Sequence, residues 1–500
     1  MKLHELTASL RRVSVVHDEN VDVTSLSTDS RQVQKGALFI ALRGGGLRDR
    51  HEYVSAAVEQ GASAVLVEEA QEHLAVPQIV VPDVRLATAI LADKFHGHPS
   101  RRLKVIGVTG TNGKTTVCQM IDRILTDAGK RTGVLGTIGK RIVGVEGETH
   151  NTTPEAPEFQ KVLSEMVEAK CDYAITEASS EALDLRRVGG TRYHAAVFTN
   201  LTQDHLNYHK TMENYFQAKA FLFSRLGNEY ADSALETPYG VLNVDDERGA
   251  MLAKHASVEC LTYGIANPAD VYATDVRTLP DGISFTVSTP VGDEQIHMTL
   301  TGQFNVYNAL AAITIGLCEE ISLSSIAASL AGFSGVPGRL ERVASDARFT
   351  VLVDYSHTPD SLLNALSACR QLTKNRVLCV VGCGGDRDKG KRPIMAKTAA
   401  QLADVSIFTS DNPRTEDPDA ILDDMMRGVE ALPEGAGEIE RIRDRRLAIQ
   451  RAVLKAGEGD VILIAGKGHE TYQIVGTTTY PFDDREVAKE AIEILRQKKA

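Results

Sequence analysis

The chain has 500 residues, of which 43% are apolar and 24% charged, and its formal net charge is −12. This composition is typical of a globular protein, and the length predicts about three domains. The negative charge argues against a nucleic-acid-binding protein, because such proteins usually carry a basic surface. An anionic small substrate stays compatible with it, provided that a local basic pocket receives the substrate.

The seven cysteines are scattered and form no CxxC pair, so we expect neither a disulfide framework nor a zinc site. The first residues, "MKLHELTASLRRV", lack the continuous apolar segment of a signal peptide. No run approaches the roughly 18–20 apolar residues of a membrane span. We therefore expect a cytoplasmic protein with reduced thiols, no membrane contact and no nucleic-acid partner.

The first hundred residues carry short α/β signals, with a strand at 36–42, a helix at 51–62 and a linker at 96–102. Between 104 and 245, continuous apolar strands alternate with helices, which predicts a parallel sheet covered on both faces. The strands are expected at 104–110, 173–179, 195–201 and 239–245, and the first helix from Lys114 to about Asp127.

Residues 260–300 change to an alternating, β-rich pattern, and a helix is expected at 305–320. Past the turn-like segment 335–342, a third α/β region begins. Its strands are "FTVLVDYS", "RVLCVVGCGG", "VSIFTSD" and "DVILIAGKG", each followed by a helical stretch. This pattern predicts a second doubly wound sheet, with ligands at the carboxyl ends of its strands.

The segment "TGTNGKTT" has the features that a triphosphate needs. Gly110 and Gly113 allow a sharp turn with inward N–H groups, the helix start adds positive potential, Lys114 supplies a cation and Thr115 offers a hydroxyl to Mg²⁺. The strict P-loop pattern fails by one place, because Val108 stands where its first glycine belongs. The alternative is an ordinary strand-to-helix turn, which this residue set disfavours.

"GTNGKTT" resembles the phosphate loop of the Mur ligases, ATP-dependent amide-bond ligases whose superfamily includes folylpolyglutamate synthetase. Further motifs follow in order: "NTTPE", "TEASSEALDLRRV", "NLTQDHLNYH", "YFQAKAFLF", "GQFNVYNALAA", "PGRLE", "DYSHTPDSL", "GCGGDRDKGKRP", "DNPRTEDP" and "AGKGHE". They resemble the Mur ligases that add the third peptide residue to the UDP-linked peptidoglycan precursor.

The resemblance implies a three-domain α/β architecture. It assigns residues 1–100 to a UDP-binding domain, 101–336 to a central ATP-binding domain with a P-loop and a parallel sheet, and 337–500 to a Rossmann-like domain that binds the amino acid. The chain is expected to be a monomer.

The chemistry follows from the reactants. Joining a carboxylate to an amine in water is uphill, so the carboxylate first attacks the γ-phosphate of ATP and becomes an acyl phosphate. Phosphoryl transfer between anions needs positioning and charge neutralisation, for which Lys114 and Mg²⁺ are the expected suppliers.

The resemblance also implies roles for individual residues. Thr115, Glu177 and His205 would hold Mg²⁺, and the amine of Lys219 would form a carbamate that helps to hold a second Mg²⁺. Apolar neighbours would favour the neutral amine that this reaction needs. Without the resemblance, Lys219 reads as a solvated helix lysine and His205 as part of a polar helix start. Lys114, Glu177, His205 and Lys219 form the expected catalytic set.

The remaining substrate contacts come from the same resemblance. ATP is expected to contact Gly110, Thr111, Asn112, Gly113, Lys114, Thr115, Thr116, Asn305, Arg339, Asp354 and His357. The UDP-linked dipeptide is expected to contact Ser30, Thr152, Thr153, Ser179, Arg187 and Lys219. Two positions depart from the family pattern, since Glu181 stands in place of a histidine and Leu185 in place of a glutamine.

The incoming amino acid is indicated by "DNPR" and "GKGHE". The guanidinium of Arg414 suits a carboxylate, which the distal centre of diaminopimelate has and the side chain of lysine lacks. Glu470 would pair with the ammonium of that centre. The expected pocket consists of Arg387, Asp411, Asn412, Pro413, Arg414, Gly466 and Glu470.

The "DNPR" form resembles the members that add meso-diaminopimelate, and addition of L-lysine is the alternative. Folylpolyglutamate synthetase and a non-catalytic P-loop nucleotide-binding protein are further rivals, which the motif set disfavours.

Overall fold

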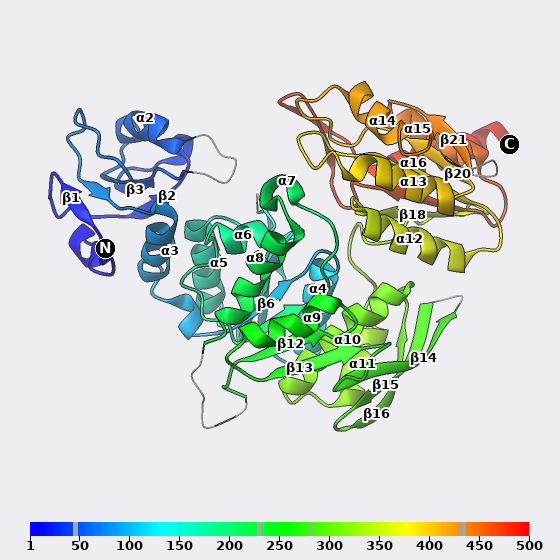
Figure 1. The fold of residues 1–500 in the computed structure, drawn as a ribbon, viewed down its shortest axis with the longest axis horizontal. Coiled ribbons are helices and arrows are strands. Elements are labelled where there is room, and N and C mark those ends of the chain that lie inside the picture. Colours follow the sequence, from blue (N-terminus) through cyan, green and yellow to red (C-terminus); the bar gives the residue numbers. More distant parts are fainter. Residues whose placement is uncertain are drawn as a thin grey trace.

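The computed structural model describes residues 1–43, 49–149, 151–227, 233, 235–279, 282–430, 432 and 437–499. Along the chain they form three α/β lobes, each built on its own main sheet (Figure 1). The N-terminal and C-terminal lobes lie at opposite ends of the molecule, with the central lobe between them. The domain boundaries at residues 100 and 336 stay a prediction.

The N-terminal lobe is a five-stranded sheet of order β1-β5-β4-β3-β2, parallel except for the β1–β5 pair. The expected strand at 36–42 contains β3, and the expected helix at 51–62 is divided into a 3-10 turn and α2. Its elements are α1 (Leu3–Thr7), β1 (Ser14–Val16), β2 (Ser25–Ser27), η1 (Ser30–Gln32), β3 (Ala37–Ile40), η2 (Arg50–Tyr53), α2 (Val54–Glu59), β4 (Ala64–Val67), β5 (Gln78–Val80), α3 (Val84–Phe95) and η3 (Pro99–Arg101).

The central lobe has an eleven-stranded sheet of order β16-β15-β14-β13-β12-β11-β6-β10-β7-β8-β9. It is parallel from β14 to β7, as the apolar strand pattern predicts, and antiparallel strands extend both ends. The extension by β8 and β9 was not predicted.

The elements of this lobe are β6 (Lys104–Thr109), α4 (Lys114–Asp127), β7 (Thr132–Gly136), β8 (Gly139–Ile142), β9 (Val145–Gly147), α5 (Ala156–Glu168), β10 (Tyr173–Glu177), α6 (Ser180–Asp184), β11 (Ala195–Phe198), α7 (Leu206–His209), α8 (Met212–Ser224), β12 (Tyr239–Asn243), α9 (Glu247–Leu252), η4 (Ala253–His255), β13 (Cys260–Gly264), β14 (Val271–Leu279), β15 (Gly282–Thr289), β16 (Gly292–Met298), α10 (Gln303–Cys318) and α11 (Leu323–Ala331).

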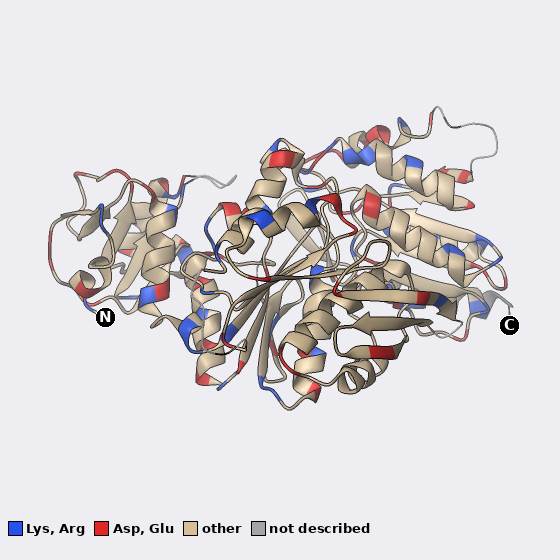
Figure 2. Ribbon diagram, turned by 60° about the horizontal axis from the view of Figure 1, so that its bottom comes forward, with Lys and Arg blue, Asp and Glu red and all other residues tan. Residues whose placement is uncertain are grey.

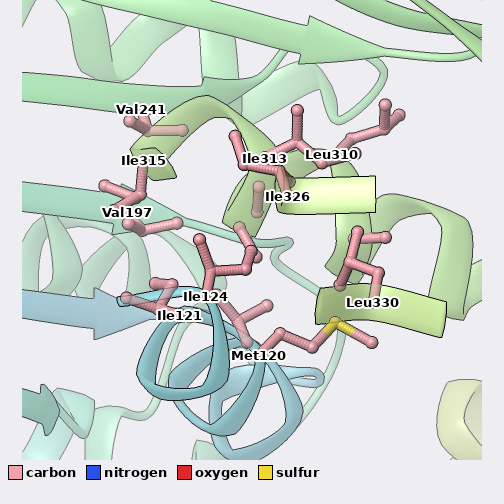
Figure 3. Packing of buried hydrophobic residues seen from close by; sticks show 14 of the residues in the cluster. Met120, Ile121, Ile124, Val197, Val241, Leu310, Ile313, Ile315, Ile326 and Leu330 are labelled. Carbon is pink, nitrogen blue, oxygen red and sulfur yellow. The ribbon is translucent and has the colours of Figure 1, made fainter. Parts of the chain in front are cut away.

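One apolar cluster fixes the helix that follows the phosphate loop. Ile121 and Ile124 of α4 belong to one buried cluster with Val197 and Val241 of the sheet and with residues of α10 and α11 (Figure 3). Burial of apolar side chains contributes about 25 cal/mol per Å² removed from water, so this contact between helix and sheet stabilises the lobe. The amino end of α4 is thereby held at the edge of the sheet.

The C-terminal lobe has a six-stranded sheet of order β17-β18-β22-β19-β20-β21, parallel except for the β17–β18 pair, and a separate β23–β24 hairpin. Its elements are β17 (Glu341–Arg342), β18 (Thr350–Asp354), α12 (Pro359–Leu372), β19 (Val377–Val381), α13 (Lys391–Leu402), β20 (Val405–Phe408), α14 (Pro418–Met426), β21 (Glu438–Arg441), α15 (Arg445–Lys455), β22 (Val461–Ala465), β23 (Tyr472–Val475), β24 (Thr478–Pro481) and α16 (Asp484–Lys499).

Figure 2 shows acidic and basic residues mixed over the elements of all three lobes. Among the described residues, no helix combines the length and apolar character that crossing a bilayer requires.

Candidate active site

The phosphate loop joins β6 to α4 at the carboxyl edge of the central sheet. Gly110 and Gly113 have φ angles of +149° and +87°, which L side chains rarely adopt. A Cβ at Gly110 would overlap the Thr199 hydroxyl, and one at Gly113 would overlap the Asn308 amide oxygen. Only glycine fits these two positions, as the sequence predicts for a loop that turns sharply.

Lys114 folds back over this loop. Its Nζ donates to the carbonyl oxygens of Gly110 at 2.9 Å and Thr111 at 2.8 Å. Burial lowers the pKa of Lys114, and the nearby Glu177 carboxylate opposes this. The ammonium group is thus held at the N-terminus of α4, where a phosphate would bind.

A cavity of about 300 Å³ lies beside the loop, between the central and C-terminal lobes. Asn112, Gly113 and Thr116 line it from the central lobe, and Arg339 and Asp354 line it from the C-terminal lobe. These five residues, all predicted to contact ATP, therefore face one space. Its volume is at the lower end of the range usual for small-ligand sites.

Other residues of this cavity were not predicted. Asn243, Asn308 and Asp360 also line it. The predicted residue Asn305 lies behind Asn308, whose Nδ2 donates to the Asn305 amide oxygen at 3.1 Å. His357, which was expected to contact ATP, lines a different cavity.

Two hydrogen bonds join the lobes beside this cavity. Arg339 Nη2 donates to Thr115 Oγ1 at 3.2 Å, and Asn112 Nδ2 donates to Asp360 Oδ2 at 2.8 Å. The C-terminal lobe therefore contacts the phosphate loop directly.

Glu177 ends β10, next to β6, and is buried at the same sheet edge as the phosphate loop. Its Oε1 accepts the Thr137 N–H at 2.8 Å, and its Oε2 accepts the Thr137 hydroxyl at 3.0 Å. The Thr137 hydroxyl also lies 3.1 Å from that of Thr152. Thr137, which sequence reasoning missed, thus links two predicted site residues.

The predicted dipeptide contacts join the same network. Thr153 Oγ1 donates to the Glu177 carbonyl at 2.6 Å and accepts the Ser179 N–H at 3.2 Å. Arg187 Nη1 donates to the Thr153 carbonyl at 3.2 Å and its Nε lies 3.1 Å from Glu155 Oε1. Thr153, Ser179 and Arg187 therefore form one group beside Glu177.

Ser30 lies apart from this group. It begins η1 in the N-terminal lobe, where Arg50 Nη1 donates to the Thr28 carbonyl of the preceding turn. Ser30 lines neither of the two cavities between the central and C-terminal lobes.

Lys219, on α8, is 1% exposed. Its Nζ donates at 2.8 Å to the Gly110 carbonyl, the oxygen that Lys114 also contacts, and lies 4.5 Å from the Tyr215 ring centroid. Burial lowers the pKa of Lys219 well below its usual range, and the Lys114 cation lowers it further. The setting favours a neutral amine, unlike the solvated lysine that the sequence alone suggests.

A second cavity, of about 260 Å³, lies between the same two lobes. Thr152, Asp204, His205 and Asn207 line it from the central lobe. From the C-terminal lobe it is lined by Tyr355, His357, Cys383, Gly384, Arg387, Asp388, Lys391, Asp411, Asn412, Arg414, Gly466 and Glu470. Of the residues predicted to hold the amino acid, this set lacks only Pro413. The carbonyl of Pro413 instead packs against Gly385.

Arg414 is held in place by its backbone and one nitrogen. Its φ is +51°, its N–H donates to the Ile474 carbonyl at 3.1 Å, and its Nη1 donates to the Gly385 carbonyl at 2.8 Å. The β23–β24 hairpin thus supports the segment that carries Arg414.

Asp204 is a buried carboxylate among the residues that line the second cavity, and sequence reasoning missed it. It lies 3.4 Å from His205 Nε2, 3.7 Å from His357 Nε2 and 3.6 Å from Lys391 Nζ. Burial alone would raise the pKa of Asp204, but these three groups together hold it well below its usual range. In the sequence, only its position next to the predicted site residue His205 in "DHLNYH" could have indicated that Asp204 belongs to the site.

The two departures from the family pattern have different surroundings. Glu181 Oε1 lies 3.3 Å from His205 Nδ1, and this contact lowers the pKa of Glu181. Leu185 is buried at the end of α6. Glu181 is therefore part of the polar site, whereas Leu185 is part of the apolar packing.

The expected metal ligands, which include a threonine hydroxyl and a lysine carbamate, stay a prediction. Within the described parts of the chain, no group of three or more His, Cys, Asp or Glu side chains is arranged to hold a metal ion. Mg²⁺ commonly takes only one or two carboxylates together with phosphate oxygens and waters. Thr115 and Glu177 at one sheet edge fit an ion that arrives with a nucleotide.

A larger cavity, of about 940 Å³, lies at the opposite edge of the central sheet and includes none of the predicted site residues. Glu319 is one of its lining residues, and its buried carboxylate accepts from Tyr173 OH at 2.6 Å, Tyr239 OH at 2.9 Å and Lys104 Nζ at 3.1 Å, and lies 2.8 Å from His194 Nε2. Both oxygens of Glu319 are thus taken up by side chains from β6, β10, β12 and the turn before β11, so the network ties these segments together.

Fold and site together define an α/β protein with a phosphate loop and with two cavities between its central and C-terminal lobes. Sequence models of three Mur ligase domains match the chain: the Mur ligase family catalytic domain at residues 22–96, the Mur ligase middle domain at 108–316, and the glutamate ligase domain at 338–468. The chain belongs to the Mur ligase family, which confirms the resemblance found in its motifs.

Close relatives share the whole length. The chain is 47% identical over 492 residues to the UDP-N-acetylmuramoyl-L-alanyl-D-glutamate–2,6-diaminopimelate ligase of Bacillus cereus, with 98% of each chain covered. It is 48% identical to the ligase of that name from Geobacillus thermodenitrificans, over 99% of this chain and all of the relative. A solved structure of a ligase so named is 33% identical, with a TM-score of 0.66 over 99% of both chains. This confirms the three-domain α/β architecture.

Proposed function

We propose that this chain adds meso-2,6-diaminopimelate to UDP-N-acetylmuramoyl-L-alanyl-D-glutamate with cleavage of ATP to ADP and inorganic phosphate, through an acyl phosphate. The observation that carries the proposal is the second cavity, where Arg387, Arg414 and Glu470 share one space with His205. Two guanidinium groups and a carboxylate suit the zwitterionic distal centre of diaminopimelate. The side chain of L-lysine offers nothing to the guanidinium groups, so that alternative is disfavoured.

The nucleotide would occupy the cavity beside the phosphate loop. Its phosphates would lie at the start of α4, and Lys114 would neutralise the developing charge. Thr115 and Glu177 would hold Mg²⁺, which supplies further charge neutralisation when bound.

The two chemical steps balance as follows. A carboxylate oxygen of the D-glutamate residue attacks the γ-phosphorus, and ADP leaves. The amine nitrogen of diaminopimelate then attacks the acyl carbon, inorganic phosphate leaves, and the nitrogen loses a proton. Arg187 would orient the dipeptide, and contact between the lobes would exclude water from the acyl phosphate.

Lys219 would act as a carbamate. Its neutral amine would bond to the carbon of CO₂ and lose one proton, which converts a potential cation into an anion. The burial of Lys219 and its contact with Gly110 support this role, because the change would occur next to the phosphate loop. Monomeric state and cytoplasmic location stay predictions.

The test uses the full chain with ATP, Mg²⁺ and UDP-N-acetylmuramoyl-L-alanyl-D-glutamate, offered either meso-diaminopimelate or L-lysine, with products identified by mass. We expect the diaminopimelate adduct and ADP release that requires both co-substrates. Incorporation of lysine alone would overturn the specificity. Release of ADP without the UDP-linked dipeptide would contradict the whole proposal.

Labelling tests the intermediate separately. With ¹⁸O in the D-glutamate carboxylate, one labelled oxygen should appear in the inorganic phosphate. Unlabelled phosphate would exclude the acyl phosphate.

A further inference from the structure

A buried lysine lies behind the second cavity. The side chain of Lys467 is 0% exposed, and it is not among the residues that line the cavity. Its Nζ donates to Asn412 Oδ1 at 3.0 Å and to Glu470 Oε2 at 2.8 Å, and lies 5.4 Å from the Tyr472 ring centroid. Both hydrogen-bond acceptors, Asn412 and Glu470, do line the cavity.

The three side chains form a closed triangle. Asn412 Nδ2 donates to the same Glu470 Oε2, at 2.9 Å, and Asn412 Oδ1 also accepts the Ile474 N–H at 2.9 Å. Glu470 Oε2 therefore has two donors. The other oxygen, Oε1, makes no hydrogen bond to any residue that the structure describes. Oε2 of Glu470 is thus held by Lys467 and Asn412, and Oε1 is available to a ligand in the cavity.

The charge of Lys467 matters as much as its hydrogen bonds. A buried charge is tolerated when it is paired, and removal of one partner leaves the other uncompensated. With Lys467 present, the charge of Glu470 is balanced before any ligand enters. Without Lys467, the pocket would gain one unit of negative charge and would favour a cationic side chain over a zwitterionic one.

We infer that Lys467 is a positioning residue that sets amino-acid specificity. It fixes Glu470 so that a single carboxylate oxygen receives the distal ammonium, while the arginines across the cavity receive the distal carboxylate. This inference rests on the proposed function, because it takes diaminopimelate to be the amino acid that binds in the second cavity.

The test compares Lys467→Met and Lys467→Arg with the wild-type full-length chain. For Lys467→Met we expect the KM for diaminopimelate to rise on the order of tenfold to a hundredfold, the loss usual for a charge-assisted contact. The kcat should change less than about threefold, and the KM values for ATP and the UDP-linked dipeptide should stay the same. Preference for diaminopimelate over L-lysine, measured as the ratio of kcat/KM values, should fall.

Lys467→Arg keeps the charge and the donors but displaces them, so its KM should rise by a smaller factor. If Lys467→Met does not fold, the KM of Lys467→Arg for diaminopimelate tests the inference instead. In a Glu470→Ala background, Lys467→Met should add no further increase in KM, because Lys467 acts through Glu470.

Lys104→Met is the matched control, since it also removes the lysine partner of a buried glutamate, Glu319, at the far edge of the central sheet. It should lower thermal stability without changing the KM for diaminopimelate. An unchanged KM in both Lys467 variants, or an equal rise in all three KM values, would overturn the inference. A wild-type enzyme that does not use diaminopimelate would instead refute the proposed function.

Discussion

Replacement of Arg414 by alanine tests the amino-acid pocket most directly. One guanidinium nitrogen, Nη1, is committed to the Gly385 carbonyl at 2.8 Å, which leaves Nε and Nη2 for a ligand carboxylate. A hydrogen bond to a charged group contributes about 1.5–3 kcal/mol. Since about 1.4 kcal/mol corresponds to a factor of ten, the KM for diaminopimelate should rise roughly 10- to 150-fold. The left-handed backbone conformation at φ +51° is about equally unfavourable for arginine and alanine, so the change in KM reports the loss of the guanidinium group.

The assay is steady-state ADP release with diaminopimelate varied and both other substrates saturating. Arg414→Lys keeps a cation without the planar fork and should fall between wild type and alanine. Arg427→Ala, which removes an exposed arginine of the same lobe, is the control and should behave as wild type. An unchanged KM for diaminopimelate in the alanine variant would refute the assignment of Arg414 to the distal carboxylate.

Three further variants test other parts of the molecule. Lys219→Ala should abolish ligation, and short carboxylic acids should restore part of it if a carbamate is needed; full activity without them would exclude that role. Gly113→Ala places a Cβ against Asn308 at φ +87° and should weaken binding of a fluorescent ADP analogue at least tenfold, while an unchanged Kd would contradict the strain argument. Burial opposes ionisation of Glu319, but His194, Tyr173 and Lys104 outweigh it and bring its pKa to about 2. Relative to the usual value of 4.5, this contributes about 3 kcal/mol of stability, present above about pH 4.5 and lost as the pH falls toward 2. Glu319→Gln should therefore lower the Tm at pH 7 by several degrees and weaken the dependence of Tm on pH below 4.5; an unchanged Tm would exclude the network as a source of stability.

Local signals explain what the sequence predicts well. The helix from Lys114 to Asp127 appears with those bounds, because the glycines that turn the chain and the apolar face that binds the sheet all lie within twenty residues. The segment that carries Arg414 is likewise contiguous, so Asp411, Asn412 and Arg414 reach the cavity together, although Pro413 does not.

Contacts between distant residues explain what the sequence does not predict. Thr137 holds both oxygens of Glu177 from forty residues away, on a β7–β8 turn without a strong periodic signal. Asp204 meets His357 and Lys391 only because two lobes pack together. Lys467 reads as one residue of a glycine-rich turn, and its burial depends on Asn412, fifty-five residues earlier.

The contacts between the lobes also bear on how substrates bind. Thr115 and Asn112, which are expected to contact ATP, are partners of Arg339 and Asp360 in this structure. A nucleotide that takes Thr115 and Asn112 as its own partners competes with those hydrogen bonds and must replace them. Nucleotide affinity and the packing of the C-terminal lobe are therefore linked, because the free energy needed to break these two hydrogen bonds reduces the free energy of nucleotide binding. The second cavity is built from both lobes. For an amino acid bound there, as proposed, ATP would change the affinity to the extent that it changes how the lobes pack.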